Sequence, residues 1–187
     1  MDKKWLPLTV ALGAAGVAVV TASLWPDGEE KPPLPQTLCH GALSRQTAEL
    51  IDEGKGGEVS TEEWESPGKG DQAVFLGCSV MRANPDNDYP REIFKLVISD
   101  ERYDSGPRKD SVPLGPGFKG WVRPKQAEAT LPAGCAARMG STAPYIRVTL
   151  LKPSKMDPVD RNTAIRNNGA VVREAATKLA KKYGCAA

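Results

Sequence analysis

Tyr145-Ile146-Arg147-Val148-Thr149-Leu150 is the stretch of sequence that decides the fold. Its aliphatic side chains alternate with Tyr, Arg and Thr, so that every second side chain lies on the same face of an extended chain. A strand of this kind has one face toward a core and the other toward solvent, as is common in antiparallel sheets. The stretch therefore predicts an antiparallel sheet with one covered face.

Other segments carry strand signals, at 58–65, 74–81, 93–99 and 126–131, and the alternation in 126–131 is as clean as that in 145–150. Side chains alternate in the last three of these segments, as they do in 145–150. The segment from Glu58 to Glu65 is polar and is typical of an edge strand, because charged side chains there discourage pairing with another chain. Together these segments predict a sheet of about five strands.

Two helices are expected to accompany the sheet. Ser44 can cap a short N-terminal helix that ends before Gly54. A long C-terminal helix is expected to begin with Asp157 as N-cap and Pro158 in the first turn, and Gly184 suits its end. Its apolar face would consist of Ile165, Val172, Ala175, Ala176, Leu179 and Tyr183. The predicted fold class is α+β, with the long helix across the sheet.

The segment from Trp5 to Trp25 contains no charged residue. As a helix it would be about 30 Å long, enough to cross the hydrocarbon core of a bilayer. Lys3 and Lys4 precede it, and basic residues stay on the cytoplasmic side. Residues 1–25 are therefore predicted to form a single-pass anchor in the cell membrane, with the N-terminus cytoplasmic and the rest of the chain outside.

A cleaved signal peptide is the alternative for this segment. Val20-Thr21-Ala22 has small or apolar residues at the positions that a signal peptidase requires, and cleavage after Ala22 would release the domain as a secreted protein. We favour the retained anchor because the apolar run continues through Leu24 and Trp25 without a polar segment. A proline-rich linker at 26–37 would follow as an extended spacer, and it leaves residues 38–187 as the extracytoplasmic domain.

The four cysteines, Cys39, Cys78, Cys135 and Cys185, all follow the apolar segment. An even number of cysteines in an exported domain indicates disulfides, here with three possible connectivities. We favour Cys39–Cys78 with Cys135–Cys185, because the first ties the short helix to a strand and the second ties the last helix to the sheet. Each bond would contribute about 4 kcal/mol by chain entropy. No metal or cofactor site is predicted, since no CxxC pair is present and His40 is the only histidine.

Charge and motifs give few functional signals. The formal net charge is +2 in 187 residues, with both signs mixed along the chain, and this does not indicate a nucleic-acid partner. Gly115-Pro116-Gly117-Phe118-Lys119-Gly120 matches the pattern of a dinucleotide-binding loop, but its prolines and the following Pro124 do not allow the helix that such a loop must open. A glycine-proline loop is the better interpretation.

Two sets of charged residues are candidates for function. Glu62, Glu63 and Glu65 could supply a pair of carboxylates for hydrolysis, although edge strands carry charges for protection as well. The basic residues of the C-terminal helix, Arg166, Arg173, Lys178, Lys181 and Lys182, could meet an anionic lipid or wall polymer, or could simply be a solvated helix face. His40 is expected to pack or cap near the Cys39 disulfide.

Three segments resemble a family of exported proteins. Residues 38–44 (LCHGALS), 75–78 (FLGC) and 179–185 (LAKKYGC) resemble those of short actinobacterial proteins that are membrane-anchored or secreted and carry paired cysteines. The resemblance implies a location in the cell envelope and agrees with the favoured cysteine pairing. It implies no activity, because the shared residues are disulfide landmarks.

The sequence thus predicts a membrane-anchored extracytoplasmic domain without a catalytic constellation. Its expected role is that of a binding or accessory module of the cell envelope, with an envelope protein or polymer as partner. An envelope hydrolase that uses carboxylates, or a structural subunit that assembles through its membrane helix, are the alternatives.

Overall fold

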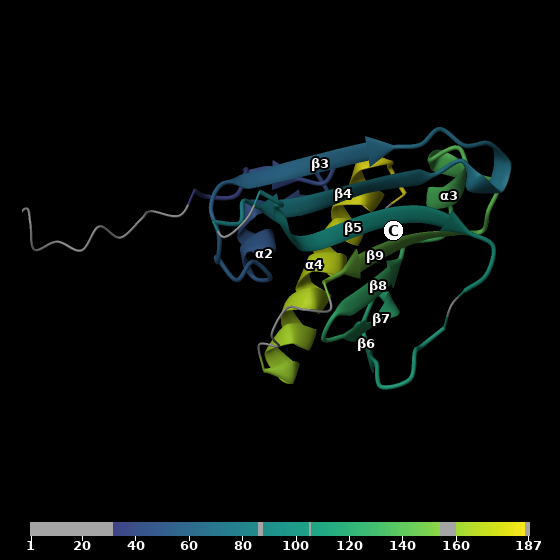
Figure 1. Cartoon of the computed structure of the whole chain (residues 1–187). Coiled ribbons are helices and arrows are strands. Elements are labelled where there is room, and N and C mark those ends of the chain that lie inside the picture. Colours follow the sequence, from purple (N-terminus) through teal and green to yellow (C-terminus); the bar gives the residue numbers. More distant parts are fainter. Residues whose placement is uncertain (1–31, 86–87, 105, 154–159, 186–187) are drawn as a thin grey trace, which may run out of the picture. The chain divides into compact units, whose positions relative to one another are not determined.

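The computed structural model describes residues 32–85, 88–104, 106–153 and 160–185 (Figure 1). The predicted anchor at 1–25 and the possible cleavage site after Ala22 lie outside these residues. Among the helices that are described, none has the length and apolarity needed to span a bilayer. Leu34 is only 1% exposed and strand β1 (Thr37–Leu38) follows it, so part of the predicted linker at 26–37 is folded.

Within the described residues, seven strands form the main sheet: β3 (Val59–Glu65), β4 (Phe75–Arg82), β5 (Arg91–Glu101), β6 (Val112–Pro113), β7 (Lys119–Arg123), β8 (Gln126–Thr130) and β9 (Tyr145–Leu151). Their order across the sheet is β3-β4-β5-β9-β8-β7-β6, and every neighbouring pair is antiparallel (Figure 1). The predicted α+β class and antiparallel sheet are confirmed.

The prediction of about five strands was too low. All five predicted strands are present, and β6 and β7 extend the sheet beyond β8. Sequence patterns missed β7 because Gly120 lies within it, Pro124 follows it directly, and Trp121 was assigned to the glycine-proline loop. The loop itself is present between β6 and β7, where the amide of Phe118 donates to the carbonyl of Gly115 over 3.3 Å.

One face of the sheet, which we call the inner face, carries the core. Ile146, Val148 and Leu150 of β9 lie on it and are at most 1% exposed. The pairing register places Leu96 and Ile98 of β5 beside Leu150 and Val148, and both are fully buried. The alternation that predicted β9 therefore gives the correct buried face.

Helix α4 (Arg161–Lys182) covers the inner face over β7, β8 and β9, and in Figure 1 it crosses behind the strands. Its N-cap is Asp160, which accepts a hydrogen bond from the amide of Thr163 at 2.9 Å, so the described helix begins later than predicted. Asp157 and Pro158 lie outside the described residues. Gly184 adopts a left-handed conformation with φ of 64°, as expected for the residue that ends a helix.

The predicted apolar face of α4 is largely correct. Val172, Ala175, Ala176 and Leu179 are at most 3% exposed, while Ile165 and Tyr183 pack against the core from its margin. The buried set of the helix also includes Ala164, Asn168, Gly169, Val171 and Ala180.

The N-terminal segment covers the rest of the inner face. Strands β1 and β2 (Leu43–Ser44) pair with each other, and the short helix α2 (Arg45–Glu49) follows. Ser44 is the N-cap of α2, as predicted. The carboxylate of Glu174 in α4 accepts hydrogen bonds from the amide and the hydroxyl of Ser44, each at 3.1 Å, and so joins α2 to α4.

Both favoured disulfides are present, Cys39–Cys78 and Cys135–Cys185, with Cα atoms 5.1 Å apart in each. Cys78 lies on the inner face of β4, so the first bond fastens the N-terminal segment to the sheet. Cys135 opens a short helix, α3 (Cys135–Arg138), which the sequence did not predict. The second bond fastens the end of α4 to α3.

Candidate functional site

The face of the main sheet opposite α4, which we call the open face, consists of the remaining side chains of each strand. Cross-strand pairing places one row of residues along it: Trp64, Gly77, Val97, Thr149, Glu128 and Trp121. Beside this row lie Phe75 on β4 and the paired Lys95 and Leu151. The two ends of the row differ in what surrounds them.

The end of the open face that runs from the β3 edge to the end of β9 is partly exposed and partly apolar. Phe75 is 43% exposed and Leu151 is 36% exposed, and Val97 between them is partly exposed. Large apolar side chains in this state form contact surfaces when they are contiguous. This end of the face is therefore a candidate for ligand binding.

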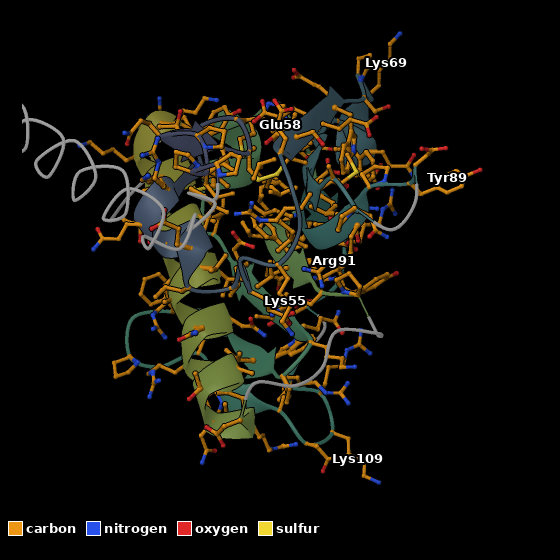
Figure 2. All side chains as sticks on the ribbon, turned by 60° about the vertical axis from the view of Figure 1, so that its left-hand side comes forward. Lys55, Glu58, Lys69, Tyr89, Arg91 and Lys109 are labelled. Atoms are coloured by element: carbon orange, nitrogen blue, oxygen red, sulfur yellow. A yellow bond between two sulfur atoms is a disulfide. The ribbon has the colours of Figure 1, made fainter. Side chains whose placement is uncertain are left out.

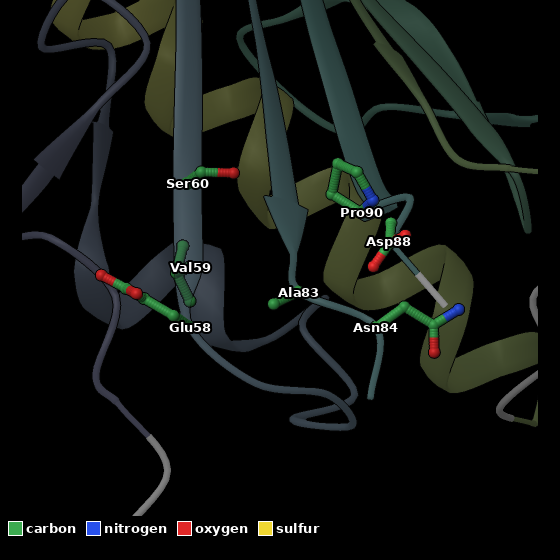
Figure 3. Close-up of a pocket in the computed structure, with 7 residues that line it drawn as sticks. All are labelled: Glu58, Val59, Ser60, Ala83, Asn84, Asp88 and Pro90. Carbon is green, nitrogen blue, oxygen red and sulfur yellow. The ribbon is translucent and has the colours of Figure 1, made fainter. Parts of the chain in front are cut away.

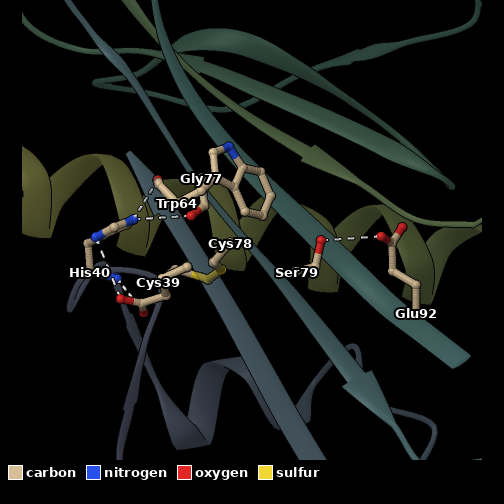
Figure 4. Close-up of a disulfide and its surroundings, with 8 residues drawn as sticks. Cys39, His40, Trp64, Gly77, Cys78, Ser79 and Glu92 are labelled. Atoms are coloured by element: carbon tan, nitrogen blue, oxygen red, sulfur yellow. Dashed lines mark hydrogen bonds and ion pairs between the residues drawn. A yellow bond between two sulfur atoms is a disulfide. The ribbon is translucent and has the colours of Figure 1, made fainter. Parts of the chain in front are cut away.

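Trp64 is the largest side chain of this surface, and the position of its ring depends on the absence of a side chain at Gly77. Its indole ring lies over Gly77, where a Cβ atom would overlap the ring (Figure 4). The ammonium of Lys95 lies 5.8 Å from the centre of the ring, within range of a cation–π interaction. Trp64 is thus held as a fixed aromatic surface by its neighbours on β4 and β5.

The end of the open face near β7 is closed. Trp121 is 2% exposed, and its cross-strand neighbour Glu128 is 4% exposed. Arg147 binds Glu128 at 3.2 Å and Glu101 at 3.5 Å, and it also donates to the carbonyl of Tyr103 at 2.8 Å. The segment after β5 is thereby held against this end.

A basic cavity of about 610 Å³ lies at the margin of the open face. Leu151 belongs to the open face and also lines this cavity. The residues that line the basic cavity are Asp110, Arg123, Pro124, Lys125, Gln126, Leu151, Lys152 and Arg161. They come from the β5–β6 connection, the β7–β8 turn, the end of β9 and the start of α4. The ammonium of Lys152 donates to the carbonyl of Ile51 at 3.4 Å. Burial lowers the pKa of Lys152, although the charges of Glu53 and Asp52 oppose this shift.

A second cavity of about 440 Å³ lies at the other end of the sheet, between the start of β3 and the β4–β5 turn (Figure 3). Its lining residues are Glu58, Val59, Ser60, Ala83, Asn84, Asp88 and Pro90. The lining contains two carboxylates and no cation, and it is contributed by an edge strand and a turn. We find no constellation for catalysis in it.

His40 packs beside the Cys39–Cys78 disulfide, as expected. Its Nε2 atom lies 3.2 Å from the carbonyl of Trp64 and 3.1 Å from that of Gly77, and its Nδ1 atom lies 3.6 Å from the carboxylate of Glu63 (Figure 4). The backbone amide of His40 also donates to Glu63 at 2.7 Å. Cys39 and His40 both have φ of 57°, a conformation that these contacts and the disulfide maintain. The group clamps the N-terminal segment to β3 and β4.

The three candidate carboxylates on β3 are not brought together. Glu62 lies on the open face, whereas Glu63 and Glu65 lie on the opposite side of the strand. None of the three lines either cavity described above. The geometry of the described residues therefore provides no acid–base pair at these positions.

The predicted basic stripe of α4 is divided among separate contacts. Arg173 donates to the carbonyl of Leu114 at 2.9 Å, and Lys178 forms an ion pair with Glu174 at 2.7 Å. Lys182 donates to the carbonyl of His40 at 3.3 Å. Arg173 and Lys182 thus join α4 to its neighbours, whereas Lys178 pairs within the helix, and the three do not form one anionic-ligand site.

A buried ion pair joins the end of α2 to β4. Asp52 and Arg82 are in contact at 2.5 Å, and their side chains are at most 5% exposed. Burial would raise the pKa of Asp52, but the hydrogen bonds from Arg82 and the Gly54 amide, with the charges of Arg82 and Arg91, lower it below its ordinary value. Arg91 also donates to the carbonyl of Lys55 at 2.8 Å; both residues are labelled in Figure 2. These contacts are structural.

Comparisons with protein-family models, curated proteins and solved structures found no match. A search of the described residues for groups of three or more metal-ligating side chains found none.

Sequence analysis identified neither the partly exposed surface around Trp64 nor the basic cavity. Both depend on residues from different strands, and only the pairing register shows that Trp64 meets Gly77. The tryptophan in an otherwise polar edge strand was the one available signal.

Proposed function

We propose that this chain is a membrane-anchored, extracytoplasmic binding module of the cell envelope, and that the open face binds a carbohydrate polymer of the envelope. The observation that carries the proposal is the surface formed by the exposed Phe75 and Leu151 and the partly exposed Trp64 and Val97, on the face of the sheet opposite the core. The function is one of binding, with no reaction assigned to it.

The proposed location rests on two features of the chain. The uncharged segment from Trp5 to Trp25 is long enough to be an anchor. The described domain joins all four of its cysteines in disulfides, which persist in oxidising compartments outside the cytoplasm. The resemblance to exported actinobacterial proteins agrees with this location.

The proposed ligand follows from the chemistry of the open face. Sugar rings have apolar faces that pack on aromatic side chains, and Trp64 and Phe75 provide such side chains at low entropic cost. Thr149 and Gln126 offer polar groups on the same face for sugar hydroxyls. An extended, shallow surface suits a polymer better than a small molecule, which prefers a deep pocket.

Location is tested by protease treatment of intact cells and of spheroplasts that make the full chain. We expect the C-terminal domain to be cleaved from outside while a cytoplasmic control protein stays intact. Membrane extraction with alkaline carbonate then separates an anchored chain from a secreted one. Protection of the domain in both preparations would contradict the proposed location.

Binding is tested with the full chain in detergent and purified, solubilised envelope polysaccharide. We expect Trp64→Ala to weaken binding about tenfold, a loss of about 1.4 kcal/mol, because the variant removes the aromatic side chain on which a sugar ring packs. Tyr89→Ala is the matched control, because Tyr89 is 81% exposed and lies in the β4–β5 turn, outside the strands that form the open face.

Near-ultraviolet circular dichroism of both variants checks that the fold is retained. An equal loss of binding in Trp64→Ala and Tyr89→Ala, or no binding by the native chain, would contradict the proposal. A protein that binds at Trp64 in place of the polysaccharide would also overturn the choice of ligand.

A further inference from the structure

The charged side chains that line the basic cavity are mostly cationic. Its lining has four cationic side chains, Arg123, Lys125, Lys152 and Arg161, against the single carboxylate of Asp110. Asp160 lies next to Arg161 but is engaged in capping α4. Even with both carboxylates counted, the described residues around the cavity carry a positive formal charge.

Two arginines of the cavity have unused hydrogen-bonding capacity. In the described part of the chain, the Arg123 side chain has neither an ion pair nor a hydrogen bond, and Arg161 donates only to the carbonyl of Asp110, at 3.2 Å. Arg147 in the centre of the open face differs, since it binds two carboxylates. A guanidinium has five N–H donors in a planar arrangement that matches phosphate oxygens.

The frame of the cavity is fixed from two sides. Asn168, which is fully buried in α4, donates from Nδ2 to the carbonyls of Arg123 and Pro124, both at 3.0 Å. On the other side, the amide of Lys152 donates to the carbonyl of Lys125 at 2.9 Å. The backbone of the β7–β8 turn is therefore fixed before any ligand binds, which lowers the entropic cost of binding.

We propose that the basic cavity binds a phosphate ester group, with Arg123 and Arg161 as its ligands and the charge of Lys125 beside them. Its volume of about 610 Å³ accommodates a phosphate together with the glycerol or sugar that carries it. Lys152 contributes charge from the rim, since its ammonium already contacts Ile51.

The identity of the carrier rests on the proposed function. Leu151 belongs to both the open face and the basic cavity, so a phosphorylated envelope polysaccharide could contact both at once. The headgroup of an anionic phospholipid offers the same chemistry from the membrane surface. A polysaccharide would depend on Trp64 as well as on the cavity, whereas a headgroup would depend on the cavity alone.

The test uses the full chain in a nonionic detergent and isothermal titration with two probes. Glycerophosphoglycerol represents the headgroup, and a phosphorylated fragment of envelope polysaccharide represents the polymer. The double variant Arg123→Gln with Arg161→Gln should weaken binding of either probe by tenfold or more, and added salt should weaken native binding. Arg138→Gln, which changes an exposed side chain at the end of helix α3, is the single-charge control.

The outcomes separate this inference from the proposed function. Loss of fragment binding in both the cavity variant and Trp64→Ala supports the phosphate site with a polysaccharide as the carrier. Cavity-dependent binding of glycerophosphoglycerol alone supports the phosphate site and assigns it to lipid. The phosphate site is overturned if neither probe binds, or if Arg138→Gln reduces binding as much as the cavity variant. In that case, Trp64-dependent binding of a neutral polysaccharide still tests the proposed function by itself.

Discussion

On the inner face of the main sheet, Ile98 and Val148 are fully buried beneath α4 and the N-terminal segment, whereas Val97 and Thr149, their neighbours in sequence, are partly exposed on the open face. The same two strands therefore supply both the core and the candidate binding surface. What differs is the covering, since both disulfides hold segments on the inner side or at its margin. A sheet that is stabilised from one side can leave the other side available for a ligand.

The open face contains a second contrast, between its two tryptophans. Trp64 and Trp121 lie in the same row, but Trp121 is 2% exposed and Trp64 lies partly exposed over Gly77. The charged group of Arg147, Glu128 and Glu101 lies between them. Stability and binding should therefore respond differently to changes on the two faces and at the two ends.

The largest loss of stability is expected when the end of α4, which covers the inner face, is no longer fastened by its disulfide. Cys135→Ser together with Cys185→Ser opens a loop with a sequence separation of 50 residues. By chain entropy the free energy of unfolding should fall by about 4 kcal/mol. Urea denaturation under non-reducing conditions measures this change, and an unaltered midpoint would show that the end of α4 needs no covalent link.

Alanine substitutions at two consecutive residues of β5 compare the two faces directly. Leu96→Ala removes a fully buried side chain of the inner face and should lower the free energy of unfolding by about 3 kcal/mol. Val97→Ala, its control on the open face, should cost less than about 1 kcal/mol, because a partly exposed side chain leaves no cavity. Similar losses in both variants, measured by thermal or urea denaturation, would mean that the open face is covered in solution.

Acid should weaken the attachment of the N-terminal segment through Asp52. Its pKa in the fold lies below the unfolded value of about 3.9, so its stabilisation is complete above that value and is lost as the pH falls through the folded pKa. Asp52→Asn should cost about 2 kcal/mol at neutral pH, and this difference should shrink below about pH 4. Urea denaturation of both proteins across the acid range checks the slope, and a constant difference would exclude a role for the Asp52 charge.

Apart from the Val97→Ala control, the smallest effect on stability is expected at Gly77. Gly77→Ala places a methyl group where the Trp64 ring lies, so the ring must move toward solvent at a cost of about 1 kcal/mol. Tryptophan emission should shift to longer wavelength, and polysaccharide binding should fall as it does in Trp64→Ala. Gly140→Ala serves as a control, since nothing lies within 4 Å of a Cβ atom there, although its φ of 84° adds its own strain. An unshifted emission spectrum would show that Trp64 does not depend on Gly77.

Much of the inner face could be predicted from the sequence, because alternation and helical periodicity report burial directly. The β9 pattern, the Ser44 cap and the apolar face of α4 are examples. Strand β7 was missed because its residues carry no alternation of their own, and Trp121 is buried through pairing with Glu128. Asn168 illustrates the same limit, since a polar residue at a core position is explained only by its contacts with the β7–β8 turn.

The candidate sites were less predictable than the fold. The basic cavity combines four separate segments, and none of them carries a run of positive charge. The basic residues that did form a run at the end of α4 are occupied in part by structural contacts. The positions of basic residues in the sequence therefore did not show which basic side chains line a cavity in the fold.

Quenching of tryptophan fluorescence by acrylamide tests most directly whether the exposed end of the open face binds the polymer. The full chain is measured with and without solubilised envelope polysaccharide, beside Trp64→Phe, in which Trp5, Trp25 and Trp121 remain. We predict that the polysaccharide protects native fluorescence from the quencher and leaves the quenching of Trp64→Phe unchanged. The same protection in both proteins, or none in either, would contradict binding at Trp64.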